Sequence, residues 1–245
     1  MDGNWSPGIS GLMSMATAAA RPWLHTPIHE NTAERVLSAC GITAQSSLSS
    51  IRVLDFGCGN GRYLEVFARR LPLENVVGVD VDDNSLEQAR SAGFNVIRLD
   101  ENIVQLPFET GQFDVVFSSN VIEHIPKDKY YLYLKEIARV MRPRGILALG
   151  APNYPYKRAF DILAAFRNRE LFTYYLFDDP THCNRVRVLD VERDLEPYFT
   201  DIKLMPSELP FQRWFSVLQR EDMQYRLRRF GNKFFGTARR RADPS

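Results

Sequence analysis

The sequence predicts an α/β fold with a parallel sheet covered by helices on both faces. From residue 51 onward, short apolar runs rich in β-branched residues alternate with segments whose apolar residues recur at helical spacing. The apolar runs are nearly continuous, as expected for strands that are buried on both faces. With 245 residues, the chain can form one main α/β domain with a sizeable core, plus extensions.

The individual elements follow one another with recognisable ends. The expected helix at 83–93 closes at Gly93, and the turn sequence RPRG at 142–145 leads into the fifth expected strand. Strands are expected at 51–56, 75–80, 94–99, 113–120, 145–153 and 200–206, and helices at 29–40, 61–71, 83–93, 127–141 and 187–199.

The alternation is interrupted after the fifth expected strand. Residues 152–186 form an insertion with many aromatic side chains, and a substrate lid would lie at such a carboxyl strand end. The predicted organisation is a helical cap at 1–45, a core at 46–206 that includes this lid, and a last segment at 207–245. In the last segment we expect a final strand at 211–220, then a basic helix that fades into a tail.

Composition and charge are those of a soluble globular protein. Hydrophobic residues make up 44% and charged residues 25%, and the net charge of +1 gives no signal for a nucleic-acid partner. Cys40, Cys58 and Cys183 have no metal-ligand spacing and indicate a reducing compartment. Without a leader pattern or a run of about 18 apolar residues, we expect a cytoplasmic protein that does not span a membrane.

The stretch VLDFGCGNGRYL, residues 53–64, predicts the cofactor. Gly57, Gly59 and Gly61 follow an apolar strand, and glycines here let the backbone turn tightly and approach a nucleotide-like ligand. Their G-x-G-x-G spacing differs from the G-x-G-x-x-G that seats a dinucleotide pyrophosphate on a helix N-terminus. Asp55 would repel a pyrophosphate but attract the ammonium and sulfonium groups of S-adenosylmethionine.

Several motifs resemble those of class I S-adenosylmethionine-dependent methyltransferases, in particular the ubiquinone and small-molecule group (methyltransferase type 11/12). The resemblance covers roughly residues 50–153 and implies a Rossmann-like, doubly wound sheet of seven strands, the last antiparallel. It also implies that S-adenosylmethionine binds across the carboxyl ends of the first strands. The motifs are VLDFGCGNGRYL, GVDVDDNSLEQA, LPFETGQFDVVFSSNVIEHI and RVMRPRGILALGAPN.

The resemblance assigns residues to the cofactor. Asp80 would accept hydrogen bonds from the ribose hydroxyls, Val81 would pack on the adenine, and Asn120 would lie next to the transferable methyl group. Where relatives have an aspartate that accepts from the adenine, this chain has Asn102, with Asp100 as a rival acceptor. The expected cofactor residues are Asp55, Gly57, Cys58 (as a small space-filler), Gly59, Gly61, Asp80, Val81, Asn102, Ile103 and Asn120.

His182 is the first candidate for a general base, which would help methyl transfer to an alcohol or phenol. It lies in the insertion sequence DDPTHCN, where Asp178, Asp179 and Asn184 could orient its ring. Proline and clustered aspartates also favour a plain turn, and this alternative stays open.

His124 is the second candidate and follows Glu123 after the fourth expected strand. A structural or positioning role for the two residues is the alternative. Some relatives bind a divalent metal through Glu-x-x-Glu-His, but Asn120 stands in place of the first glutamate, so no metal is expected.

The C-terminal segment 211–245 carries nine cationic side chains against three acidic ones, an excess of +6. Phe230, Phe234 and Phe235 among the arginines have the composition of an interfacial helix, which could contact an anionic membrane. A solvated basic face is the alternative.

Together these features predict a methyltransferase for a small molecule, acting at oxygen in preference to nitrogen. The acceptor would be a hydroxyl of a natural product, sugar or glycolipid. N-methylation, a nicotinamide-dependent oxidoreductase and a non-catalytic binding protein remain the alternatives. The acceptor's identity and the oligomeric state are left open by the sequence.

Overall fold

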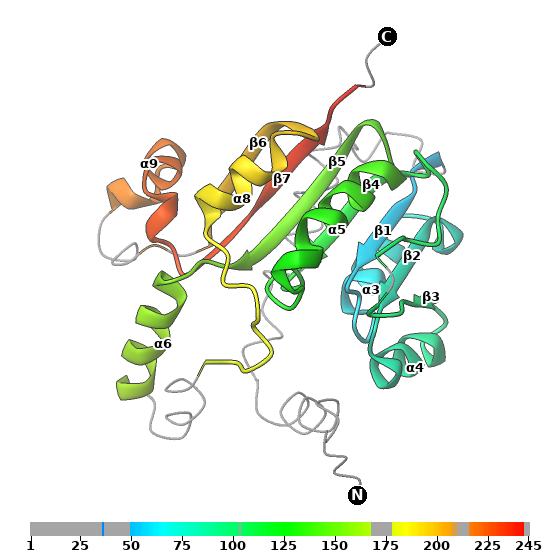
Figure 1. Ribbon diagram of the computed structural model, residues 1–245, viewed down its shortest axis with the longest axis horizontal. Coiled ribbons are helices and arrows are strands. Elements are labelled where there is room, and N and C mark those ends of the chain that lie inside the picture. Colours follow the sequence, from blue (N-terminus) through cyan, green and yellow to red (C-terminus); the bar gives the residue numbers. More distant parts are fainter. Residues whose placement is uncertain are drawn as a thin grey trace, which may run out of the picture.

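The structure, a computed structural model, describes residue 36, the ranges 50–102, 104–167 and 178–207, residue 209 and the range 216–242. At its centre is a seven-stranded sheet with the order β3-β2-β1-β4-β5-β7-β6 (Figure 1). β7 is antiparallel to β5 and β6, and the remaining pairs are parallel, which confirms the expected fold. The strands are β1 (Val53–Phe56), β2 (Val76–Asp80), β3 (Asn95–Arg98), β4 (Phe113–Ser119), β5 (Met141–Pro152), β6 (Phe199–Pro206) and β7 (Lys233–Arg240).

Helices pack on both faces of the sheet. α5 (Lys127–Val140) and α8 (Val188–Leu195) share one apolar cluster with Leu54 of β1. α3 (Arg62–Ala68) and α4 (Asp83–Ser91) share another with Val53, because successive strand residues point to opposite faces. The other helices are α6 (Tyr156–Arg167), α9 (Glu221–Arg226) and the 3-10 helices η3 (Leu73–Asn75), η5 (Ser216–Gln219) and η6 (Arg228–Phe230).

The C-terminal segment differs from the sequence expectation. The strand expected at 211–220 is wrong where the structure describes it, because η5 occupies 216–219. The expected basic helix ends at Arg226, and the last strand is β7. β7 is hydrogen-bonded on both sides, to β5 and β6, and such non-local pairing overrides the weak strand preference of a basic segment.

Phe234 and Phe235 therefore lie in a strand and not in the expected interfacial helix. Phe234 is only 1% exposed in the core, and the ring of Phe235 contacts that of Phe117 with centroids 6.1 Å apart. Phe230 packs on Tyr156, with centroids 5.3 Å apart. These aromatic side chains therefore stabilise the fold. Within the described ranges, no helix combines the length and apolar character that a bilayer crossing requires.

The expected cap at 1–45 lies outside the described residues, apart from Val36. That residue is helical and fully buried in the cluster that α3 and α4 share. Of the expected lid at 152–186, the structure describes α6 and the segment 178–186, while 168–177 lie outside the described residues. The amide of Tyr154, just after β5, donates to the Val186 carbonyl at 2.9 Å, which holds this segment beside the carboxyl end of β5.

Candidate active site

The glycine loop joins the carboxyl end of β1 to α3. Gly57, Gly59 and Gly61 have φ angles of +82°, +50° and +85°, in the region that favours glycine. The amides of Gly57 and Cys58 both donate to the Val79 carbonyl, at 2.8 and 3.0 Å. The loop is therefore a tight bend that is fixed to the end of β2.

Cys58 is 6% exposed and fills space between the loop and β2. A Cβ atom added at Gly78 would lie 2.6 Å from its sulfur. Burial raises the pKa of the Cys58 thiol above its usual range, and the nearby charges of Asp55 and Asp80 raise it further. The side chain is therefore a protonated thiol, as the sequence led us to expect.

Asp80 ends β2 and holds the loop from the other side. Its Oδ2 accepts from the Gly59 amide at 2.7 Å, and its Oδ1 accepts from the amides of Val81 and Asp82 at 2.7 and 3.0 Å. Oδ1 already accepts two hydrogen bonds, but Oδ2 accepts one and keeps a further lone pair for a ligand hydroxyl.

Asp55, at the third position of β1, is 1% exposed, and its Oδ2 has no hydrogen-bond partner within the described ranges. Burial raises the pKa of its carboxyl group to about 8, and the charge of Asp80 adds to the effect. A nearby cation would favour the ionised form of the unpartnered Asp55 carboxyl group, so this group and Asp80 fit a cationic ligand better than a pyrophosphate. The site therefore fits the cofactor that the resemblance implies.

Two of the other residues expected at the cofactor, Val81 and Asn120, directly follow β2 and β4. Val81 is 38% exposed directly after Asp80. Asn102 is exposed, and its amide donates to Oδ1 of Asp100 at 2.8 Å. Asn120 is exposed after β4 with a φ of +56°, while Ile103 lies outside the described residues.

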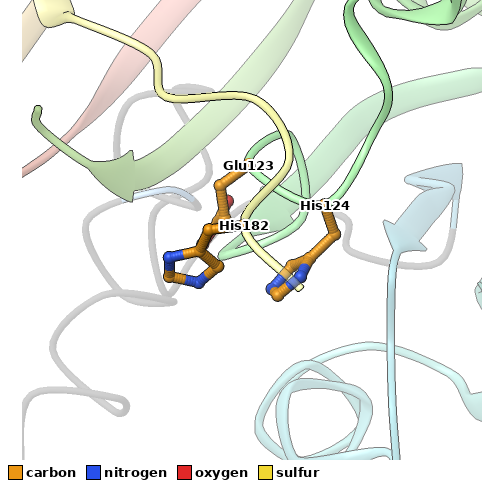
Figure 2. Close-up of side chains that lie close together, drawn as sticks. All are labelled: Glu123, His124 and His182. Carbon is orange, nitrogen blue, oxygen red and sulfur yellow. The ribbon is translucent and has the colours of Figure 1, made fainter. Parts of the chain in front are cut away.

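Glu123, His124 and His182 lie close together and form a second group, the Glu123–His124–His182 cluster (Figure 2). Glu123 and His124 come from the segment after β4, and the preceding Val121 lies against Gly57. His182 comes from the insertion, and the rings of His124 and His182 have centroids 4.8 Å apart. The two segments are joined by the Asn184 amide, which donates to the Glu123 carbonyl at 3.0 Å.

Two parallel hydrogen-bond chains orient the two imidazoles. The Tyr154 hydroxyl donates to Asp178 Oδ1 at 2.9 Å and lies 2.6 Å from Nδ1 of His182. Thr181 Oγ1 donates to Asp179 Oδ1 at 2.6 Å and lies 3.0 Å from Nδ1 of His124.

Because each hydroxyl proton goes to a carboxylate, each Nδ1 must supply the proton that it shares with the hydroxyl oxygen. Both rings thus carry their lone pair on Nε2.

Burial sets the protonation of this cluster. It lowers the pKa of His182 to about 4, with His124 adding to the effect, and it also lowers the pKa of His124. Burial raises the pKa of Glu123 to about 7. Glu123 is fully buried, and neither carboxylate oxygen has a hydrogen-bond partner in the part of the chain that the structure describes.

The sequence did not identify Tyr154 as a partner of His182. It lies two residues after the end of β5, at the edge of the sheet where α/β folds build their sites, and this position is the signal that could have identified it. Lys157 was also missed, and its Nζ lies 3.0 Å from Asp178 Oδ1.

A cavity of about 260 Å³ beside Tyr154 is lined by Tyr154, Pro155, Arg158, Asp178, Arg185 and Arg187.

Gly57→Ala should destabilise the protein more than Gly93→Ala. Both positions have similar φ angles, +82° and +87°, so each substitution should lose about 1–3 kcal/mol to backbone strain. At Gly57 the new Cβ would also lie 2.2 Å from a Val121 methyl group, whereas nothing lies within 4 Å at Gly93. Urea unfolding measures the difference, and equal losses would show that Val121 does not constrain the loop.

Comparison with known proteins places these features in a family. Residues 54–149 match the family model described as a methyltransferase domain. Demethylmenaquinone methyltransferase of Lactococcus lactis subsp. lactis (strain IL1403) is 34% identical over 125 residues, which are 47% of this chain and 49% of that protein. For 27-O-demethylrifamycin SV methyltransferase of Amycolatopsis mediterranei (strain S699), the identity is 33% over 109 residues, 40% and 38% of the two chains.

The fold is also that of solved methyltransferase structures. A SAM-dependent methyltransferase from Archaeoglobus fulgidus superposes with a TM-score of 0.60 at 19% identity, over 86% of this chain and 94% of that one. The chain spans about half or less of the length of the curated relatives named above. Residues 54–149 therefore match a methyltransferase domain, and the fold around them is the fold of a solved S-adenosylmethionine-dependent methyltransferase.

Proposed function

We propose that the protein transfers the methyl group of S-adenosylmethionine to a hydroxyl group of a small molecule. The observation that carries the proposal is the position of His124 and His182 beside the glycine loop, where the contact of each Nδ1 with a hydroxyl leaves Nε2 to act as a proton acceptor. A hydroxyl must lose its proton to become a strong nucleophile, so two such groups favour oxygen over nitrogen as the acceptor atom. Relatives named for demethylmenaquinone and 27-O-demethylrifamycin support a small acceptor.

In this proposal the chain's own residues hold the cofactor at the edge formed by β1, β2 and β4. Asp80 accepts from the ribose hydroxyls, Val81 and Asn102 contact the adenine, and Asp55 faces the cationic end. Asn120 lies by the methyl group. When bound, the cofactor would supply a methyl carbon bonded to a sulfonium sulfur, which is open to attack by an oxygen nucleophile.

His182 and His124 are the proposed catalytic residues, and two chemistries would let them activate a hydroxyl. Nε2 of His182 could accept the hydroxyl proton directly, with Tyr154 and Asp178 fixing the ring. Alternatively, the cluster could hold a cation that lowers the pKa of a bound hydroxyl. Holding the acceptor oxygen in line with the methyl carbon supplies the larger share of the acceleration, about 7–11 kcal/mol.

The test is incubation of the full chain with methyl-labelled cofactor and a small-molecule extract of its source cells. We expect label in a compound whose mass has risen by one methyl group, with the new methyl on oxygen by NMR. Label on nitrogen would contradict the oxygen assignment. Saturable cofactor binding without any labelled product would favour the non-catalytic alternative.

Asp80→Asn should weaken cofactor binding about 10- to 150-fold, since hydrogen bonds to a charged group contribute about 1.5–3 kcal/mol. Isothermal titration calorimetry with S-adenosylmethionine measures the change. Asp83→Asn is the matched control, because Asp83 is an exposed acid at the start of α4 that pairs with Arg98 at 2.9 Å. Equal affinity in the wild type and Asp80→Asn would exclude the ribose role.

A location in the cytoplasm remains a prediction from the sequence. The expected contact with an anionic membrane depended on an interfacial helix. Phe234, which was to be part of that helix, is instead buried in β7. We therefore propose no membrane partner for the C-terminal segment.

A further inference from the structure

The Glu123–His124–His182 cluster contains a buried acid whose carboxylate oxygens receive no hydrogen bond from the described residues. Glu123 is 0% exposed, and both of its carboxylate oxygens lack a hydrogen-bond partner among the residues that the structure describes. The hydrogen-bond chains through Tyr154 and Thr181 leave a lone pair on Nε2 of each histidine. A buried carboxylate is stable only when it is paired, protonated or bound to a cation.

We propose that this cluster binds a divalent transition-metal ion, with zinc as the best fit, through Glu123, His124 and His182. One ligand atom from each residue lies within 4.8 Å of the other two. Bonds of about 2.0–2.2 Å to a tetrahedral ion would bring these atoms to roughly 3.4 Å from one another, a closure of about 1 Å that side-chain rotations can supply. Imidazole and carboxylate are ligands that suit zinc.

The surroundings have the features of an outer shell around a metal. Histidine ligands usually donate their second ring nitrogen to a carboxylate, carbonyl or hydroxyl, which fixes the ring and its tautomer. His182 does so through Tyr154 and Asp178, and His124 through Thr181 and Asp179. The Asp179 carboxylate also lies 3.9 Å from Nε2 of His182 and adds negative charge beside the site.

This inference differs from the sequence expectation of no metal. That expectation rested on Asn120, which stands where a first glutamate would be needed. The third ligand instead comes from His182, 58 residues after His124, because the bond between Asn184 and Glu123 brings the insertion to the segment after β4. Spacing within one segment could not indicate this ligand.

The inference rests on the proposed function for its chemical role. Three protein ligands leave a fourth position open, as in catalytic zinc sites, and a hydroxyl bound there would lose its proton more readily. The two histidines would then act on the hydroxyl as ligands of the ion. This route explains the unpartnered Glu123, which direct proton transfer to His182 leaves unexplained.

Metal binding can be measured without cofactor or acceptor. The full chain, stripped of metal by a chelator, is titrated with Zn²⁺ by calorimetry and with Co²⁺ by visible absorption. We expect one ion per chain and a cobalt spectrum without a thiolate band. Tyr154→Phe and Thr181→Val should weaken Zn²⁺ binding roughly 10- to 100-fold, and Glu123→Gln and His182→Ala should weaken it further.

Cys183→Ser is the matched control, because the exposed Cys183 thiol lies beside the cluster, 3.2 Å from the His124 carbonyl oxygen. It should leave Zn²⁺ affinity unchanged. The proposal is overturned if wild type shows no saturable Zn²⁺ or Co²⁺ binding, or if Glu123→Gln and His182→Ala bind as wild type does. Parallel titrations with S-adenosylmethionine test the cofactor site separately, so loss of one kind of binding is distinguishable from loss of the other.

Discussion

Replacing Asp55 by asparagine should stabilise the free protein at pH 8 and weaken its binding of S-adenosylmethionine. The pKa of Asp55 is raised to about 8 because the carboxyl group is fully buried and lies near the charge of Asp80. Its pKa in the unfolded chain is near 3.8, so the folded state retains a proton that the unfolded state loses. The stability that this proton provides is complete below pH 3.8 and is lost as the pH rises towards 8.

The size of the effect follows from the same linkage. Each pH unit in this window lowers the free energy of unfolding by up to about 1.4 kcal/mol. Asparagine is neutral at every pH and resembles the protonated acid in shape, so Asp55→Asn should lack this dependence. We expect the variant to exceed wild type in urea unfolding by about 1–2 kcal/mol at pH 5 and by about 4–5 kcal/mol at pH 8.

Cofactor binding should change in the opposite direction. The positive charges of S-adenosylmethionine favour the ionised carboxylate, so wild type should bind more tightly at pH 8 than at pH 6. Asp55→Asn should bind about 10- to 150-fold more weakly at pH 8, the loss of one charged interaction. Saturating cofactor should also reduce the pH dependence of wild-type stability. A stability difference between the two proteins that is equal at pH 5 and pH 8 would refute this account of Asp55.

The cofactor half of the site could be predicted from the sequence because its signals are local. Three glycines at fixed spacing follow an apolar strand, and the structure gives all three positive φ angles. Asp55 and Asp80 were identified for the same reason, since each lies near the end of an apolar run. What the sequence did not provide is the complete burial of Asp55, which depends on the neighbouring strands β2 and β4.

The other half depends on contacts between distant residues. Tyr154 and His182 are separated by 28 positions, and His124 and Thr181 by 57. No periodicity reports such pairs, so His182 was predicted only from the chemistry of its side chain and its surrounding aspartates. β7 was missed for a related reason: its partners β5 and β6 determine it, and a basic segment has only weak strand preference of its own.

His182→Ala should reduce turnover about 10²- to 10⁴-fold and leave the affinity for S-adenosylmethionine unchanged. The side chain acts on the acceptor, either by taking its proton or by holding a cation, and in this proposal it does not touch the cofactor. The loss should therefore appear in kcat, with the KM for the cofactor unaltered. Thermal unfolding of the variant checks that the half-buried position tolerates alanine.

Tyr154→Phe provides a version of this test that keeps the histidine. The variant removes the hydroxyl that accepts from Nδ1 of His182 and donates to Asp178, so the ring loses its fixed tautomer. We expect turnover to fall about tenfold, the size of one buried hydrogen bond, since the ring itself stays in place. Tyr156→Phe is the control, because Tyr156 packs its ring on Phe230 and should tolerate the loss of its hydroxyl.

Wild-type turnover in both His182→Ala and Tyr154→Phe would remove His182 from the mechanism. A chelator that abolishes wild-type turnover, with recovery on adding Zn²⁺, would assign the histidine to the metal instead of to direct proton transfer.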